Sequence, residues 1–210
     1  MTISVSRGNN APAVSPTSPR TQATQAPHSA PEANTPPRAA LHSRDVFEAN
    51  NPGLDAINGL QLQAGRPHSC VTTVRANLRR AGLGGLPGTT DQDPNNPRGM
   101  MVQMLQSGQW RSMPIPGAQS QSITSPYGTV QAQVLSGEAY LQAARNGQIP
   151  EGAVVFQTEK GLDYSGGSRG SDMGIVRNGA IFNYQQMPNM SVYQNRVTDV
   201  VVMVPHNNPR

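Results

Sequence analysis

The sequence has few aromatic and few charged residues. Nine of its 210 residues are aromatic (one Trp, five Tyr, three Phe) and 28 are charged (16 basic, 12 acidic). Globular domains carry about 25% charged and 45–50% apolar residues, whereas this chain has 13% and 35%. The shortage is concentrated at the start, because residues 1–46 contain no aromatic side chain and 25 of the first 40 are Pro, Ser, Thr or Ala. We therefore expect about 165 residues to fold, enough for one hydrophobic core.

Other scarcities exclude whole classes of protein. No apolar run approaches the ~20 residues of a membrane helix, and the first residues lack the basic and apolar segments of a secretory signal peptide. A single cysteine excludes an intramolecular disulfide, and four scattered histidines argue against a structural zinc site. The basic residues, all arginine except Lys160, are spread along the chain. We therefore expect no nucleic-acid partner, no metal and no cofactor.

Residues 1–42 are expected to form a disordered leader, followed by one domain over residues 43–210. Seven prolines in the first 40 residues interrupt any helix or strand, and the apolar surface is too small to offset the entropy of ordering. With one glutamate and no aspartate up to residue 40, this Ser/Thr/Pro/Gln-rich segment resembles the uncleaved signals of bacterial type III secreted effectors. The resemblance implies secretion, into a host cell or the periplasm, with a secretion chaperone as a partner of the leader. A linker without a specific partner is the alternative.

The best-defined helix is predicted over residues 70–81. Ser69 can cap its start, Gly82 can end it, and three apolar residues share one face (Val71, Val74 and Leu78). Other expected helices are a short one begun by Ser43 and ended by Asn51-Pro52, one from Leu54 to near Gly65, a Met-rich one from Met100 to Gly108, and one capped by Ser136 and closed by Gly147. The methionines and Trp110 are expected in the core.

Strand patterns follow these helices. Strands are expected at 153–156, 173–177, 180–184 and 197–204, and residues 84–98 and 112–128 are expected to be irregular. Asn178-Gly179 predicts a hairpin turn, because both residue types tolerate positive φ. Helices first and an antiparallel sheet afterwards predict an α+β fold.

The single cysteine opens the best-defined helix. The partial positive charge and the unpaired N–H groups of a helix start stabilise a thiolate, the nucleophilic form of Cys70. A lone cysteine is more often a small buried hydrophobe, so a structural role stays open.

The order of elements after Cys70 resembles the papain-like amidases and peptidases of the NlpC and CHAP families. In these families the nucleophilic Cys opens a helix, a P-G-D-x-V-F-F element leads into a strand, and a G-H-V-G-I-x-x-G-N-G hairpin follows. The corresponding segments here are Ser69-Cys70-Val71, Pro150–Phe156 and Ser171–Gly179. The resemblance covers about residues 65–185. It implies a papain-like fold and a thiol amidase or peptidase acting on a host protein or on peptidoglycan.

The resemblance also assigns two partners to Cys70. Asp172 occupies the position of the general-base His, and Asn183 that of the third, orienting polar residue. An Asp raises the pKa of a neighbouring thiol, so this trio is not a competent triad. Three accounts are open: His206 or His68 completes the site; the domain has lost catalysis and binds a host or envelope partner through the cleft; or the similarity is coincidental and Cys70 is structural.

Overall fold

The computed structural model describes residues 50–67, 69–87, 96–159, 161–162, 170–184, 186–187 and 196–206. The chain divides into two units between residues 38 and 39, and every described residue belongs to the second. The expected leader and the helix begun by Ser43 therefore lie outside the described residues. Within the described part, no helix is long and apolar enough to cross a membrane.

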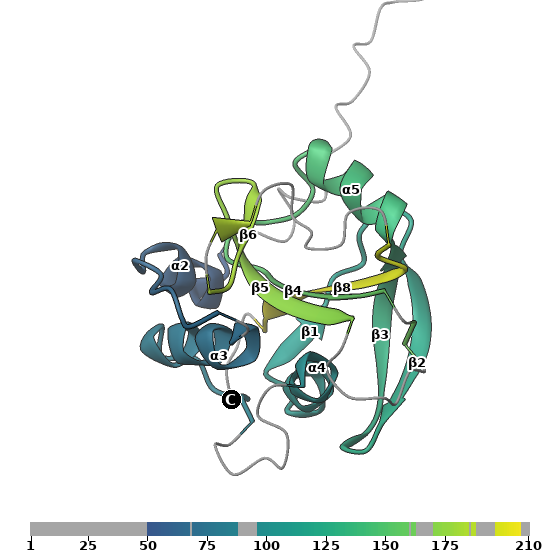
Figure 1. The fold of residues 1–210 in the computed structure, drawn as a ribbon, viewed down its shortest axis with the longest axis horizontal. Helices are drawn as coiled ribbons and strands as arrows, with labels where there is room; N and C mark the ends of the chain where they lie inside the picture. The colour runs from purple at the N-terminus through teal and green to yellow at the C-terminus, as the bar shows by residue number, and fades with distance from the viewer. Residues whose placement is uncertain are drawn as a thin grey trace, which may run out of the picture. The chain divides into compact units, whose positions relative to one another are not determined.

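The second unit is built on an antiparallel sheet with helices on both faces (Figure 1). The strand order is β2–β3–β8–β4–β5–β6–β7, and β1 pairs with β8 beside this path. The strands are β1 (Trp110–Ser112), β2 (Gln119–Ser125), β3 (Gly128–Ser136), β4 (Val154–Thr158), β5 (Ser171–Arg177), β6 (Ala180–Phe182), β7 (Gln186–Met187) and β8 (Asp199–Pro205). The helices are α2 (Pro52–Asn58), α3 (Cys70–Arg80), α4 (Pro97–Gln106) and α5 (Gly137–Arg145). This architecture confirms the α+β class and the antiparallel sheet.

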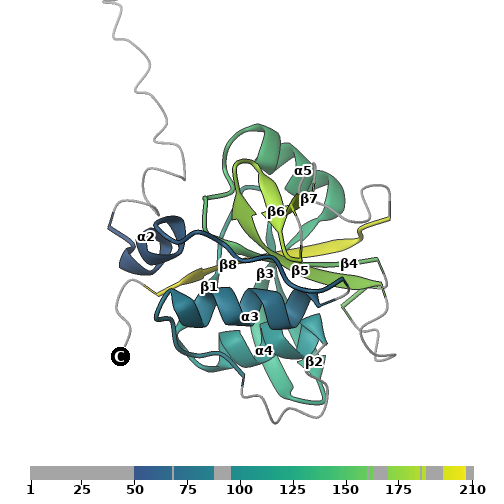
Figure 2. The ribbon, with the colours of Figure 1, turned by 60° about the vertical axis from the view of Figure 1, so that its left-hand side comes forward.

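Alternate residues of the central strands fill two core clusters. Along β8, Val201 and Met203 face the cluster beneath α3 and α4, while Val200, Val202 and Val204 face the cluster beneath α5. Figure 2 shows α3 and α4 on one side of the sheet and α5 on the other. Because both faces are covered, β4 and β8 each contain a continuous apolar run, residues 154–156 and 200–204, rather than an alternating pattern.

Most predicted elements are confirmed. Helix α3 covers the expected residues, and α5 begins where Ser136 accepts a hydrogen bond from the Ala139 N–H at 3.2 Å. Strands β4, β5, β6 and β8 lie where the apolar patterns predict them. The expected methionines and Trp110 are in the core; Met100, Met101 and Met104 are at most 2% exposed.

The prediction that residues 112–128 are irregular was wrong. Strand β2 and the start of β3 lie there, joined by the two-residue turn Pro126-Tyr127. The residues are mostly Ser, Gln and Thr, which carry little apolar signal. The alternation of apolar and polar residues that indicates the hairpin is in β3, where Val130, Ala132 and Val134 point inward.

Two helix boundaries also differ from the prediction. Helix α2 ends at Asn58 rather than near Gly65. The Arg177 guanidinium ends it by donating hydrogen bonds to the carbonyl oxygens of Ile57, at 2.7 Å, and Asn58, at 3.0 Å. Helix α4 begins at Pro97, inside the segment expected to be irregular. The Asn96 side chain caps it by accepting from the Gly99 N–H at 3.1 Å.

Candidate functional site

Cys70 lies in the first turn of α3, at the edge of the first core cluster. Val71, Val74 and Leu78 bury the face of α3 that packs on this cluster, and Cys70 is partly buried beside it. The packing of that face fixes the helix, and the helix fixes where the thiol points.

Ser69 precedes Cys70 but does not cap the helix as predicted. No hydrogen bond joins its side chain to the N–H groups of the first turn. Its hydroxyl instead donates to the Arg66 carbonyl and lies 3.0 Å from the Thr73 hydroxyl. The hydroxyl thus ties the preceding segment to the helix rather than satisfying the helix start.

The β5–β6 hairpin brings Asp172 and Asn183 together. Its turn has φ values of 53° at Asn178 and 68° at Gly179, as the Asn-Gly sequence predicts. Asp172 lies near the start of β5 and Asn183 directly after β6, so the two face each other at the open end of the hairpin. The Asn183 amide donates to the Asp172 carboxylate at 2.9 Å, and the two residues are 0% and 7% exposed.

The Cys70 thiol completes a cluster of three polar groups, here named the Cys70–Asp172–Asn183 cluster. The Asp172 carboxylate acts on the thiol both as a negative charge and as a hydrogen-bond acceptor. The pKa of Cys70 rises to about 12, first because the thiol is buried and second because Asp172 is negative and accepts its proton. The backbone N–H groups of Met173 and Val71 act in the opposite direction but do not offset these causes.

Burial also perturbs the carboxyl group of this cluster. The pKa of Asp172 rises from 3.8 to about 6 because burial disfavours its charged form. Hydrogen bonds from the Cys70 thiol, the Met173 N–H and the Asn183 amide limit this rise. At pH 7 most Asp172 carboxyl groups are therefore ionised, and the Cys70 thiol keeps its proton.

His206 does not join this cluster. The strand register places Asp172 opposite Gln157, and Gln157 opposite Val200 on β8. His206 follows the last residue of β8 and lies six residues beyond Val200, or about 20 Å away at the rise of a strand. His206 is exposed, and its backbone N–H donates to the Gln109 carbonyl at 2.8 Å. It borders a separate cavity of about 60 Å³.

The other histidine candidate, His68, lies outside the described residues. Among the described residues, no group of three or more His, Cys, Asp or Glu side chains could hold a metal ion. The structure therefore brings together three of the four predicted site residues, Cys70, Asp172 and Asn183, and separates His206 from them.

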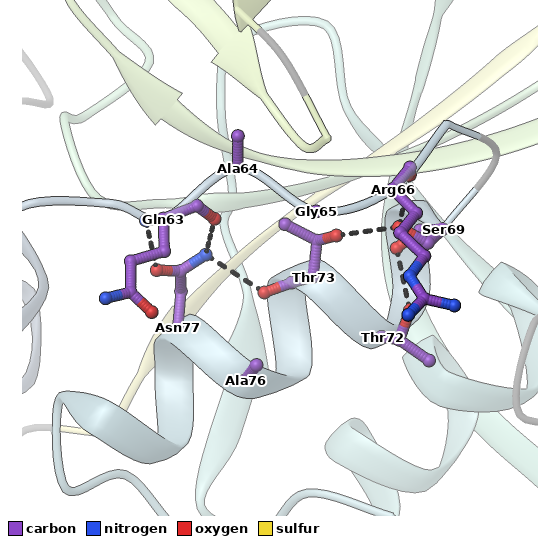
Figure 3. A pocket seen from close by; sticks show the side chains of 9 residues that line it. All are labelled: Gln63, Ala64, Gly65, Arg66, Ser69, Thr72, Thr73, Ala76 and Asn77. Carbon is purple, nitrogen blue, oxygen red and sulfur yellow. Dashed lines mark hydrogen bonds between the residues drawn. The ribbon is translucent and has the colours of Figure 1, made fainter.

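A groove of about 290 Å³ runs along α3 and was not predicted from the sequence (Figure 3). It lies between the helix and the extended segment of residues 61–66. The Asn77 amide holds this segment, accepting from the Gln63 N–H at 2.8 Å and donating to the Gln63 carbonyl at 2.9 Å. Gly65 is required there, because a Cβ atom would lie 1.7 Å from the Thr73 hydroxyl oxygen.

The polar groups of this groove largely satisfy one another. The hydroxyl groups of Ser69, Thr72 and Thr73 all take part in the hydrogen bonds that join the segment to α3 or bridge the first turn of the helix. The Arg66 side chain is exposed at one end. The only signal for the groove in the sequence is Gly65 at a position that must approach a helix closely.

Comparisons with protein-family models, with curated proteins and with solved structures found no match to this chain.

Proposed function

We propose that the domain is a non-catalytic binding module on a papain-like fold, in an effector that a bacterial type III system secretes. The observation that carries the proposal is the pairing of the Cys70 thiol with the Asp172 carboxylate. A nucleophilic cysteine needs a neighbouring base or cation that stabilises the thiolate. A buried carboxylate does the reverse, and His206 is at the other end of β8.

The papain-like assignment is supported by the relative placement of three elements. A helix with Cys at its start, the strand after Pro150-Glu151-Gly152, and a hairpin with polar residues at its open end occur in the family's order. The Cys70–Asp172–Asn183 cluster occupies the positions that the resemblance gives to nucleophile, base and orienting residue. The replacement of the base by Asp172 supports a domain that has lost catalysis and binds a host protein.

The exchange Cys70→Ala tests whether the thiol is needed. The variant is delivered by the secretion system of the source bacterium, and its effect on the host cell is compared with that of the unchanged protein at equal delivered amounts. A binding module keeps its effect, because the small buried side chain only packs. Loss of the effect in a variant with unchanged circular dichroism and melting temperature would falsify the proposal.

A cysteine amidase or peptidase is the second candidate, favoured by one observation. The backbone N–H groups of Val71 and Met173 lower the pKa of the Cys70 thiol, as donors that steady a thiolate or an oxyanion do. In such an enzyme the Cys70 sulfur attacks an amide carbonyl of a host protein or of peptidoglycan. The amine leaves with a proton, and water then releases the acid from the acyl-enzyme.

The rate of iodoacetamide labelling against pH separates the two candidates. A binding module shows labelling that rises only above the ordinary thiol range. An enzyme shows a plateau of labelling near neutral pH, because its thiol is already ionised there. Labelling of the denatured protein supplies the reference for an unperturbed thiol.

The secretion part of the proposal is supported by the composition of the leader and is tested separately. Residues 1–46 are fused to a reporter enzyme and expressed in a bacterium with a type III system. Export of the fusion, and its absence from a strain lacking the secretion ATPase, is the expected result. A fusion that stays inside both strains contradicts the secretion proposal but has no bearing on the argument about Cys70.

A further inference from the structure

Strand β2 forms one edge of the sheet and lacks the features that protect such edges. Natural edge strands are shortened, bulged, or interrupted by lysine or proline, because their unpaired N–H and C=O groups pair readily with other chains. Strand β2 has seven residues, none of them charged or proline, and its seven pairs with β3 run in unbroken register. In the described part of the chain β2 pairs with β3 alone, and Figure 1 shows it at the rim of the sheet.

The register shows which backbone groups of β2 face outward. The turn Pro126-Tyr127 has two residues, so the closing pair Ser125–Gly128 is a hydrogen-bonded pair. Hydrogen-bonded and non-hydrogen-bonded pairs alternate along an antiparallel ladder, so Gln119, Gln121 and Ile123 also bond to β3. The 3.1 Å contact between the Thr124 and Thr129 hydroxyl groups fits a non-hydrogen-bonded pair, whose side chains lie closer.

The N–H and C=O groups of Ser120, Ser122 and Thr124 therefore point away from β3. The side chains of these three residues are exposed and short, so they do not screen the backbone. Among the described residues, no second strand pairs with β2 along this edge.

The charge pattern of the hairpin favours a second copy of this chain as the occupant. Residues 112–137 contain no charged side chain, the longest such stretch in a chain with 28 charged residues. Two copies of β2 can therefore approach without bringing like charges together, although each chain has a net charge of +4. An antiparallel two-fold pairing centred on Ser122 places Ser120 of one copy opposite Thr124 of the other.

We propose that two copies of this protein associate through β2, in an antiparallel pair whose two-fold axis passes between the two Ser122 residues. Ser122 of one copy bonds to Ser122 of the other, and Ser120 bonds to Thr124, giving about six backbone hydrogen bonds. A pair of seven-residue edges buries less surface than a stable interface, which needs about 1,200 Å². The dimer is therefore weak, and the fraction of dimer depends on protein concentration. This inference is independent of the function proposed for the domain that carries the Cys70–Asp172–Asn183 cluster.

Sedimentation of the full chain over a wide range of concentrations, up to the solubility limit, tests the association. A monomer–dimer equilibrium is expected. Ser122→Pro removes the central outward N–H but none of the bonds to β3, so this variant keeps its melting temperature and stays monomeric. A monomer at every concentration in the unchanged protein overturns the proposal, as does a dimer that Ser122→Pro leaves intact.

Charge and cross-linking variants test the geometry. Ser122→Lys places two cations opposite each other across the axis and abolishes the dimer, whereas Gln131→Lys, on the neighbouring strand, leaves it unchanged. In a Cys70→Ala background, Ser122→Cys forms a disulfide-linked dimer on mild oxidation, because opposed Cα atoms of a hydrogen-bonded pair lie about 5.5 Å apart. Ser120→Cys, which faces Thr124, is the matched control and forms none. Equal cross-linking of both variants overturns the register.

Discussion

The β5–β6 hairpin meets a carboxylate at each of its ends, and the two carboxylates have opposite surroundings. At the turn, the exposed oxygens of Glu151 accept the N–H groups of Asn178 and Gly179 at 2.8 and 3.0 Å. At the open end, Asp172 is 7% exposed and shares its oxygens with a thiol and an amide. The same chemical group fixes a turn where water reaches it and opposes ionisation of a thiol where water does not. The following predictions separate these two roles.

The largest expected effect is on thiol reactivity in Asp172→His. This change removes the negative charge beside Cys70 and supplies an imidazole that stabilises a thiolate. Iodoacetamide labelling at pH 7 should rise by at least about 100-fold, because the thiol pKa falls when the negative charge is replaced by a group that stabilises the thiolate.

Two further variants control this experiment. Asp172→Asn should raise labelling less, because burial, the larger cause of the raised thiol pKa, remains. Glu151→Gln, at the other end of the hairpin, should leave it unchanged. An Asp172→His variant that folds but labels no faster would show that burial alone controls the thiol.

The second effect is on the pH dependence of stability. The pKa of Asp172 is raised from 3.8 to about 6 on folding, so the folded state binds the proton more tightly. The contribution of Asp172 to the free energy of unfolding is therefore greatest below about pH 4 and is lost as the pH rises through about 6. The loss is about 3 kcal/mol.

Urea unfolding at pH 4 and pH 7 measures this effect. The unchanged protein should lose about 2–3 kcal/mol relative to Asp172→Asn over this interval, since the variant has no carboxyl group to titrate. Taking the difference between the two proteins removes the contributions of other carboxylates. A difference that does not change with pH would contradict the raised pKa.

The third effect is on stability in Asn183→Ala. The change removes the amide that donates to the buried Asp172 carboxylate and should cost about 2 kcal/mol at pH 7. The matched control is Asn58→Ala, which removes an exposed bond to the Glu151 carbonyl and should cost about 0.5 kcal/mol. Equal losses in the two variants would mean that the amide of Asn183 does not support the carboxylate.

The smallest effect is expected at the turn. Glu151→Ala frees the N–H groups of Asn178 and Gly179, but both are exposed and can bond to water. The free energy of unfolding should fall by about 1 kcal/mol or less, measured by urea unfolding at pH 7. A loss larger than that of Asn183→Ala would reverse the ranking of the two carboxylates.

The parts of the fold that were predictable carry strong local signals. Apolar spacing located α3, Asn178-Gly179 located the hairpin, and uninterrupted apolar runs located β4 and β8, because each depends on residues close in the sequence. Strand β2 was missed because its Ser, Gln and Thr residues form a strand only by pairing with β3. The early end of α2 was missed because Arg177, 120 residues from Ile57, takes its carbonyl.

The candidate site divides in the same way. The resemblance placed Asp172 and Asn183 beside Cys70, and the structure brings these three residues together. The resemblance did not exclude His206, because the sequence does not show that β8 runs from the level of Asp172 to the opposite end of the sheet. The groove along α3 was missed because it is made by an extended segment that the Asn77 side chain holds in place.

The sequence by itself determined the α+β class, the helix that Cys70 opens and the hairpin that carries Asp172, because spacing and turn chemistry act over a few residues. The tertiary structure decided the ionisation of the thiol, the separation of His206 and the edge formed by β2. The physical reason is that burial, strand register and the field of a neighbouring carboxylate depend on residues far apart in the chain. The structure also shows where the shortage of charged residues lies, since the longest uncharged stretch of the chain contains the β2–β3 hairpin.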